Sequence, residues 1–219
     1  MRSLSFPLLS ILLLGCGSLP SPSSTISLNP NAWNFLYSTG VPAHPGAAGS
    51  GWYFDFPSCG GTTACSVNYL VTPVNLYVFG GHVSVSLQIT TTGRPTFNYK
   101  LAPDNTCDNP AHVRLFLQQK NDPLTAQAEF YRWWSNPIAY ELAAGSSTLN
   151  APLIPDQWVS VLGKIGNSSH SATDGFNTAL QNLGNVGFTF GGGCFYGHGV
   201  NVSNGTARFT LIGYSIGNQ

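Results

Sequence analysis

The segment HVSVSLQI, residues 82–89, alternates polar and apolar side chains without a break. Successive side chains of a strand point to opposite faces, so this period of two is typical of a strand with one face in the core and the other in solvent. Its apolar side is formed by Val83, Val85, Leu87 and Ile89, and its polar side by His82, Ser84, Ser86 and Gln88. We therefore interpret it as a half-buried strand and read the rest of the chain from it.

The same alternation returns in short segments separated by turn residues, at 52–56, 67–71, 97–101, 112–119, 130–134, 138–142, 158–162, 186–190 and 207–216. Gly213 is expected to mark a bulge in the last of these, because the apolar phase shifts there. Short strands without intervening long helices predict an all-β fold, a two-sheet β-sandwich of the jelly-roll type.

One short helix is expected within this sandwich. Residues 174–183 space their apolar side chains at helical intervals, at Phe176, Ala179, Leu180 and Leu183. Asp174 is the expected N-cap, and Gly184 is expected to end the helix.

Residues 1–15 are typical of an export signal peptide, since Arg2 precedes a short apolar stretch that ends in a small residue. The stretch Leu13-Leu14-Gly15-Cys16 is similar to the bacterial lipobox, in which the cysteine carries lipid and becomes the mature N-terminus. That resemblance implies a cell-envelope protein anchored to a membrane through Cys16. The alternative is an ordinary signal peptide, cut a few residues later, and a secreted protein. Residues 16–31, rich in Ser, Pro and Gly, are expected to form a flexible tether, and residues 32–219 to fold as one domain.

The cysteines that remain after Cys16 are Cys59, Cys65, Cys107 and Cys194. An even number in an exported protein indicates disulfides, and three pairings are possible. Cys59–Cys65 closes the short loop CGGTTAC, which leaves Cys107 to pair with Cys194. A zinc site is the alternative, although the chain contains no CxxC.

Charged residues make up only 7% of the chain, and the formal net charge is zero. Nucleic acid is not an expected partner, because binding it requires clustered Lys and Arg. The chain has no GxSxG and no HExxH motif, so no standard serine or zinc hydrolase site is indicated. A surface of Ser, Thr, Asn, Gln and Gly suits hydroxyl-rich ligands, but it is also common in secreted β-proteins.

The order of features from residue 139 to residue 216 resembles the galactose-binding-like jelly rolls, which include many carbohydrate-binding modules. The residues that carry it are Tyr140-Glu141-Leu142, Trp158-Val159-Ser160-Val161, the expected helix, and the strands 186–190 and 207–212. The resemblance implies sugar binding on a concave sheet face or at loop tips, often with a structural calcium ion. It is a pattern of elements, and no family sugar site matches residue by residue.

The strand 112–119 supplies the first candidate binding residues. If Val113, Leu115 and Leu117 point into the core, the opposite face carries His112, Arg114, Phe116 and Gln118. An aromatic ring covers the apolar face of a sugar, while Arg and amide groups bond its hydroxyls. The alternative is a solvated sheet face, or one covered by a loop.

Two further segments add candidates. Tyr131 and Trp133 share a face in the strand 130–134, and the alternative is that Trp133 and Trp134 both pack under loops. The glycine-rich stretch GGGCFYGHG, residues 191–199, presents Tyr196 and His198, unless it is simply a tight connection held by Cys194. Residues 104–109 carry oxygen ligands suited to calcium, although they lack the EF-hand spacing and an ordinary Asx-turn loop is the better explanation.

These observations lead to a hypothesis of carbohydrate or surface-polymer binding without catalysis. The first alternative is a small polysaccharide lyase or glycoside hydrolase on the same fold, which would need a His or Tyr base beside an Arg or Gln, or two carboxylates held close together. The second is a structural envelope protein without a ligand.

Overall fold

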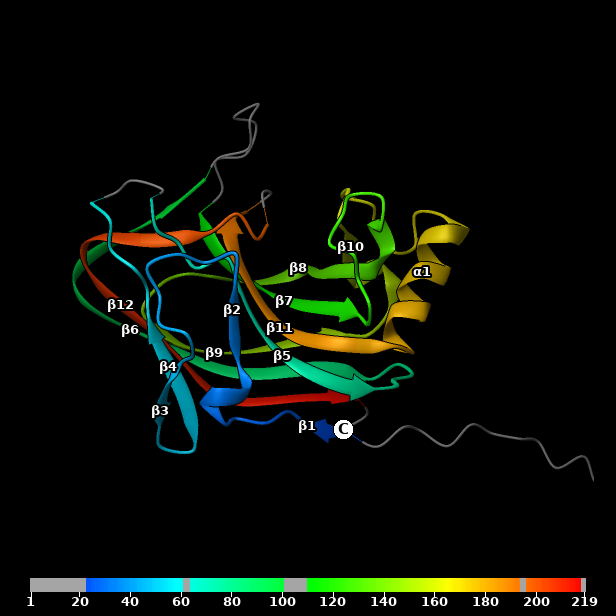
Figure 1. Cartoon of the computed structure of the whole chain (residues 1–219), viewed down its shortest axis with the longest axis horizontal. Coiled ribbons are helices and arrows are strands. Elements are labelled where there is room, and N and C mark those ends of the chain that lie inside the picture. Colours follow the sequence, from blue (N-terminus) through cyan, green and yellow to red (C-terminus); the bar gives the residue numbers. More distant parts are fainter. Residues whose placement is uncertain (1–22, 61–63, 101–109, 194–195, 218–219) are drawn as a thin grey trace, which may run out of the picture.

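The structure is a computed structural model that describes residues 23–60, 64–100, 110–193 and 196–217. Within these residues two antiparallel sheets of six strands pack against each other, and one α-helix lies at the end of the second sheet (Figure 1). The prediction of a two-sheet β-sandwich with one short helix is confirmed.

The first sheet has the strand order β3-β4-β12-β6-β9, and β1 also pairs with β12. Its strands are β3 (Gly46–Ala48), β4 (Gly51–Asp55), β12 (Val200–Gly217), β6 (His82–Tyr99), β9 (Gly145–Pro152) and β1 (Ser24–Thr25). The second sheet has the order β10-β8-β7-β11-β5-β2. Its strands are β10 (Trp158–Ser160), β8 (Arg132–Glu141), β7 (Ala111–Gln119), β11 (Leu183–Gly192), β5 (Tyr69–Leu76) and β2 (Asn34–Leu36).

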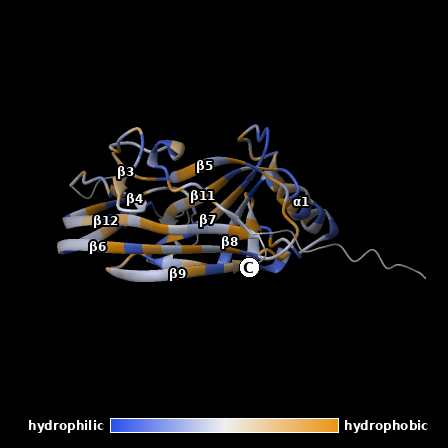
Figure 2. Ribbon diagram, turned by 90° about the horizontal axis from the view of Figure 1, so that it is seen from below, coloured by the Kyte–Doolittle hydropathy of each residue, from blue (hydrophilic) through white to orange (hydrophobic). Residues whose placement is uncertain are grey.

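The core lies between the two inner faces. All four apolar side chains of segment 82–89 are buried in it, as predicted, and Figure 2 shows the hydrophobic and hydrophilic bands alternating along β6 and β12. Phe188 of β11 meets Phe209 of β12 with 5.4 Å between ring centroids, and the ring of Trp52 stacks on Phe209 at 5.9 Å. Aromatic rings from both sheets therefore form the contact that holds the sandwich together.

The longest pairing joins β6 to β12, each of which is 18 residues long. Its register shifts between Ser203 and Gly205 and again between Leu211 and Gly213. The bulge predicted at Gly213 is thus confirmed, and it lets Tyr214 and Ile216 return to the core side after Leu211.

The helix α1 spans His170–Leu180 and so begins four residues before the predicted start. The side chain of Ser169 accepts a hydrogen bond from the Ala172 backbone N–H at 3.1 Å and serves as the N-cap. Asp174, the expected cap, lies inside the helix and pairs with His170 at 3.1 Å. Three single turns of 3-10 helix complete the element list, η1 (Pro30–Ala32), η2 (Glu129–Tyr131) and η3 (Pro155–Gln157).

The expected break at Ser135-Asn136-Pro137 does not divide two strands. Both segments belong to β8, and these residues form an irregularity at which the register with β7 shifts between Arg114 and Phe116. The Ser135 side chain bridges the irregularity by accepting a hydrogen bond from the Leu115 backbone N–H at 3.0 Å. A bulge, which a sequence pattern cannot distinguish from a turn, explains the difference.

Residues 16–31 were expected to form a flexible tether, and this expectation is wrong from Ser24 onward. Ser24 and Thr25 form β1 on the edge of β12, and Ile26 is buried in the core. Of the predicted disulfides, Cys59–Cys65 is confirmed, with 6.0 Å between its Cα atoms. Cys16, Cys107 and Cys194 lie outside the described residues. No described helix is long and apolar enough to cross a membrane.

Replacing Phe188 with Ala should lower the free energy of unfolding by about 3–5 kcal/mol, because the ring is fully buried between the two sheets. The matched control is Phe79→Ala, since Phe79 is 53% exposed, and its effect should be about 0.5 kcal/mol or less. Urea unfolding followed by tryptophan fluorescence measures both. Equal destabilisation by the two variants would contradict this description of the core.

Candidate functional site

Alternation along the second sheet places a second set of side chains on its outer face. One row across the strands contains Val71 of β5, Gly187 of β11, Phe116 of β7 and Trp134 of β8. The buried members Val71, Phe116 and Trp134, with Val159 of β10, form a small apolar cluster separate from the main core. The outer face is therefore covered by loops over much of its area, and the expectation of an open platform is corrected.

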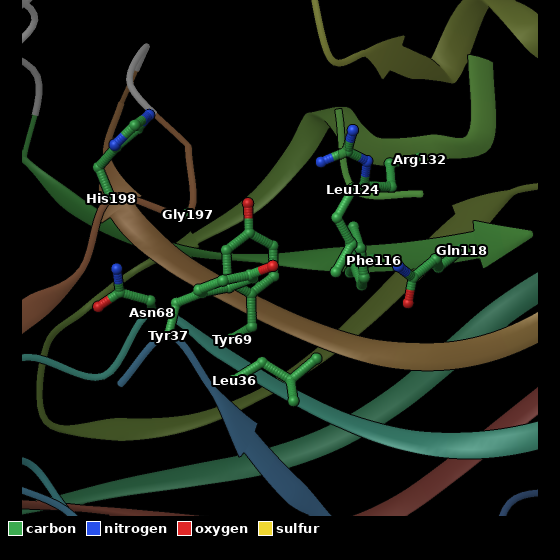
Figure 3. A pocket seen from close by; sticks show the side chains of 10 residues that line it. All are labelled: Leu36, Tyr37, Asn68, Tyr69, Phe116, Gln118, Leu124, Arg132, Gly197 and His198. Atoms are coloured by element: carbon green, nitrogen blue, oxygen red, sulfur yellow. The ribbon is translucent and has the colours of Figure 1, made fainter. Parts of the chain in front are cut away.

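A hollow of about 340 Å³ remains open in this cover. Its lining residues come from the strands β2, β5, β7 and β8 and from loops. They are labelled in Figure 3 and are Leu36, Tyr37, Asn68, Tyr69, Phe116, Gln118, Leu124, Arg132, Gly197 and His198. The size falls within the range of small-molecule sites, and the lining combines aromatic rings with a few polar groups, as such sites usually do.

Aromatic side chains form the middle of the hollow. The rings of Tyr69 and Phe116 meet edge to face with 5.3 Å between centroids, and Tyr37 meets Tyr69 at 6.0 Å. Tyr37 is 64% exposed, so most of its ring is available to a ligand. A Cβ atom at Gly187, which pairs with Phe116 across the strands, would lie 2.2 Å from the Leu70 carbonyl oxygen, so glycine allows β5 to lie close to β11 there.

Two bulky lining residues hold a backbone conformation that such residues rarely adopt. Tyr37 has a φ of 55° and Leu124 a φ of 58°. Among the described residues, the other non-glycine positions with positive φ are Asn121 and Asn204, which tolerate it readily. Strain of this kind, about 1–3 kcal/mol each, is concentrated at functional sites. At Leu124 the backbone N–H donates to Asp122 Oδ1 at 2.9 Å, which fixes the loop.

A chain of polar contacts orients Gln118 at one end of the hollow. Its amide oxygen accepts from Asn185 Nδ2 at 2.8 Å, and its Nε2 donates to Asp122 Oδ2 at 2.8 Å. The same carboxylate oxygen lies 3.0 Å from Nε of Arg132. Asp122 therefore neutralises Arg132 and holds the Gln118 amide, next to the aromatic rings.

The opposite end is formed by Gly197 and His198. A Cβ atom at Gly197, where φ is 70°, would lie 2.5 Å from the Tyr69 hydroxyl, so glycine is required for this close approach. His198 stands exposed at the rim (Figure 3). Partial burial, followed by the charge of Lys100, lowers the pKa of its imidazole, so the ring is neutral at pH 7.

Burial raises the pKa of the Tyr69 phenol from 10.0 to about 12, and the nearby Arg132 opposes this only in part. The hydroxyl is thus fully protonated at neutral pH and is available as a hydrogen-bond donor.

The structure brings three of the predicted site residues, Phe116, Gln118 and His198, to the hollow. Arg114 and Tyr196 lie beside it and contact each other, with the guanidinium carbon 4.1 Å from the ring centroid. Arg114 is 7% exposed and donates to the carbonyls of Ser135 at 2.8 Å and Gly193 at 3.0 Å.

The other three predicted residues do not line this hollow. The Nδ1 of His112 donates to the Pro110 carbonyl at 2.6 Å, and Tyr131 belongs to η2. Trp133 is fully buried in the main core, against Phe176 at 5.2 Å, so its expected place on a binding face is wrong. The strand begins at Arg132, and its outward side carries Arg132 and Trp134 instead.

Sequence reasoning missed Tyr37, Tyr69, Leu124 and Arg132. Period-two alternation groups Tyr69 with Val67 and Val71, so the pattern of segment 67–71 did not indicate that Tyr69 faces outward. Tyr37 and Leu124 come from loops, whose approach to β5 and β7 no periodicity encodes.

Comparison of the chain with protein-family models, with curated proteins and with solved structures finds no match in any of the three. The described residues contain no group of three or more His, Cys, Asp or Glu side chains arranged to hold a metal ion. The calcium-type segment 104–109 lies outside the described residues.

The raised pKa of Tyr69 makes the stability of the protein depend on pH in alkaline solution. The unfolded state releases this proton near pH 10 and the folded state near 12, so the contribution of Tyr69 is complete below pH 10 and is lost between pH 10 and 12. Tyr69→Phe should therefore reduce the fall in unfolding free energy across that interval. Urea unfolding at several pH values measures it, with exposed Tyr77→Phe as control. Identical pH slopes for wild type and Tyr69→Phe would show that the phenol is not buried as described.

Proposed function

We propose that this protein is exported, held at a membrane by lipid on Cys16, and binds carbohydrate in the hollow on the outer face of the second sheet. The observation that carries the proposal is the pairing of exposed Tyr37 with Tyr69 and Phe116 beside an oriented amide. Sugar rings present apolar C–H faces to aromatic rings and hydroxyls to fixed polar groups, and this hollow offers both.

The polar groups of the hollow suit hydroxyls in particular. The protonated Tyr69 phenol can donate to a ligand, and Asn68, whose side-chain oxygen accepts a hydrogen bond from Ser66, also lines the hollow. Ligand hydroxyls both donate and accept, so amides and phenols match them better than fixed charges do. The resemblance to carbohydrate-binding jelly rolls in residues 139–216 supports the same function.

The strain at Tyr37 and Leu124 supports binding over a purely structural role. A strained backbone persists only where surrounding contacts impose it, and here it presents two apolar side chains to solvent, 64% and 43% exposed. Folding gains little from exposed apolar surface, whereas a ligand that covers it gains directly.

Tyr37→Ala should weaken binding of the best oligosaccharide found on a glycan array by tenfold or more, about 1.4 kcal/mol, because the exposed ring is lost. Tyr77→Ala is the matched control, since Tyr77 is 57% exposed but lies outside the hollow. Calorimetric titration of the full-length chain in detergent gives both affinities, and melting temperatures check the fold. Binding that is unchanged in Tyr37→Ala, or absent from the wild type, would overturn the proposal.

A polysaccharide lyase is the second candidate, favoured by His198, Tyr69 and Arg132 lining one hollow. In β-elimination a neutral imidazole takes the proton from the carbon beside a uronate carboxylate, a C=C bond forms, and the glycosidic C–O bond breaks. The protonated Tyr69 phenol would give its proton to the departing oxygen, while Arg132 faces the carboxylate. Two-acid glycoside hydrolysis has less support, because the described residues that line this hollow include no carboxylate, and the neighbouring Asp122 is paired with Arg132.

The lyase alternative predicts that the wild-type protein generates the ultraviolet absorbance of a new C=C bond from a uronate polysaccharide such as polygalacturonate. His198→Ala should then abolish the signal, while His82→Ala on the first sheet should retain it. A wild-type protein that binds the polymer without any absorbance change excludes the lyase and leaves binding as the function.

A further inference from the structure

Two more hollows adjoin the central one and share its walls. The first, of about 260 Å³, shares Asn68 and His198 and continues to Tyr99 and Lys100. The second, of about 460 Å³, shares Leu36, Gln118 and Leu124 and continues to Lys120. Because neighbouring hollows share lining residues, we treat the three together and call them the outer groove. A single sugar fills only its centre, whereas a polymer can continue into both ends.

The charges along the outer groove are mainly positive. Lys100 lies at one end and Lys120 at the other, and Arg132 stands in the centre with its partner Asp122. The Lys120 ammonium donates to the Asn75 side chain, a neutral partner. Among the described lining residues, Asp122 is the sole carboxylate, so the lysines at both ends face the groove with an excess of positive charge.

The buried guanidinium of Arg114 adds to the positive charge at the groove. Arg114 lies under the Tyr196 ring and donates to two backbone carbonyls, and none of the ion pairs formed by the described residues includes it. Guanidinium stays charged at every physiological pH. Its field extends through low-dielectric protein toward the groove and is weakly screened there by salt. The chain as a whole carries equal numbers of acidic and basic residues, eight of each, so this excess is local.

We propose that the outer groove binds an extended anionic polysaccharide, with the carboxylates of a uronate chain near Lys100 and Lys120 and its sugar rings on Tyr37, Tyr69 and Phe116. This inference rests on the proposed carbohydrate function and narrows its ligand class. The amides of Asn98, Asn68 and Gln118 follow the same course and are suited to the hydroxyls between the charged groups.

The ligand is argued to be a glycan rather than a nucleic acid because the groove offers few fixed cations and many amides. Nucleic acid presents a charge on every nucleotide and is bound by clustered Lys and Arg. A uronate chain alternates its carboxylates with several hydroxyls per unit, which matches widely separated lysines with neutral groups between them.

The test uses the full-length protein in detergent with polygalacturonate and with its methyl ester, which keeps the sugar chain and removes the charge. Wild type should bind polygalacturonate at least tenfold more tightly than the ester, and raising the salt concentration should weaken the first and spare the second. Lys100→Gln combined with Lys120→Gln should reduce binding of polygalacturonate tenfold or more and leave binding of the ester unchanged.

Lys164→Gln is the matched control, because it removes one surface charge beside Glu129, away from the groove. It should leave both affinities at the wild-type level. An equal loss in this variant, or equally tight binding of a single-stranded oligonucleotide, would show non-specific charge attraction and overturn the inference. If the protein instead prefers neutral glycans and Tyr37→Ala weakens that binding, the anionic ligand is overturned but the proposed function stands. If no glycan binds at all, both are overturned.

Discussion

The contact between Phe188 and Phe209 across the two inner faces determines which side chains reach the outer surface. Once Phe188 points into the core, its neighbours Gly187 and Thr189 must point outward, and the paired positions on β5 and β7 follow. Phe116, opposite Gly187, is placed on the outer face by the same registration that buries Leu115 opposite Phe188. The hollow is thus a consequence of core packing, because a shift of one residue would exchange the two faces.

The outer face then needs its own cover, since Phe116 and Trp134 are too apolar to remain in water. Loops supply it, and the Arg114 guanidinium links the end of β11 to the irregular part of β8 through the carbonyls of Gly193 and Ser135. The cover closes over Trp134 and stays open over Tyr69, where Gly197 lies flat against the phenol and His198 stands at the rim. One half of this sheet face is packed and the other half is open, so rigidly packed residues support an accessible site.

Period-two alternation was sufficient to predict the sandwich, the bulge at Gly213 and the outward side of β7, since each depends only on which face a residue occupies. Alternation did not predict the features that depend on local geometry or on tertiary contacts.

The sequence of β9 is polar and rich in Ser and Thr, and it forms a strand because it pairs with β6. The helix starts at His170 because Ser169, five residues before the expected cap Asp174, serves as its N-cap. Trp133 was expected on a binding face but is buried in the core, where Phe130 of the turn η2 stacks on it at 5.8 Å. Tyr37 and Leu124 were not predicted as site residues because tertiary contacts position the loops that carry them.

Because the chain has few charged residues, the position of each one strongly affects the charge of the surface around it. Four acidic residues of the described chain form ion pairs, and three of these pairs, Asp55–Arg208, Glu129–Lys164 and Asp174–His170, involve none of the residues that line the outer groove. The fourth acid, Asp122, enters the groove but is occupied by Arg132 and Gln118. Among the described residues, Lys100 and Lys120, with the buried Arg114, then determine the sign of the charge at the groove. None of the ion pairs of the described residues includes the buried Arg114 guanidinium, and burying a charge without an ion-pair partner costs stability. The field of Arg114 would in turn attract the anionic ligand that we propose for the groove.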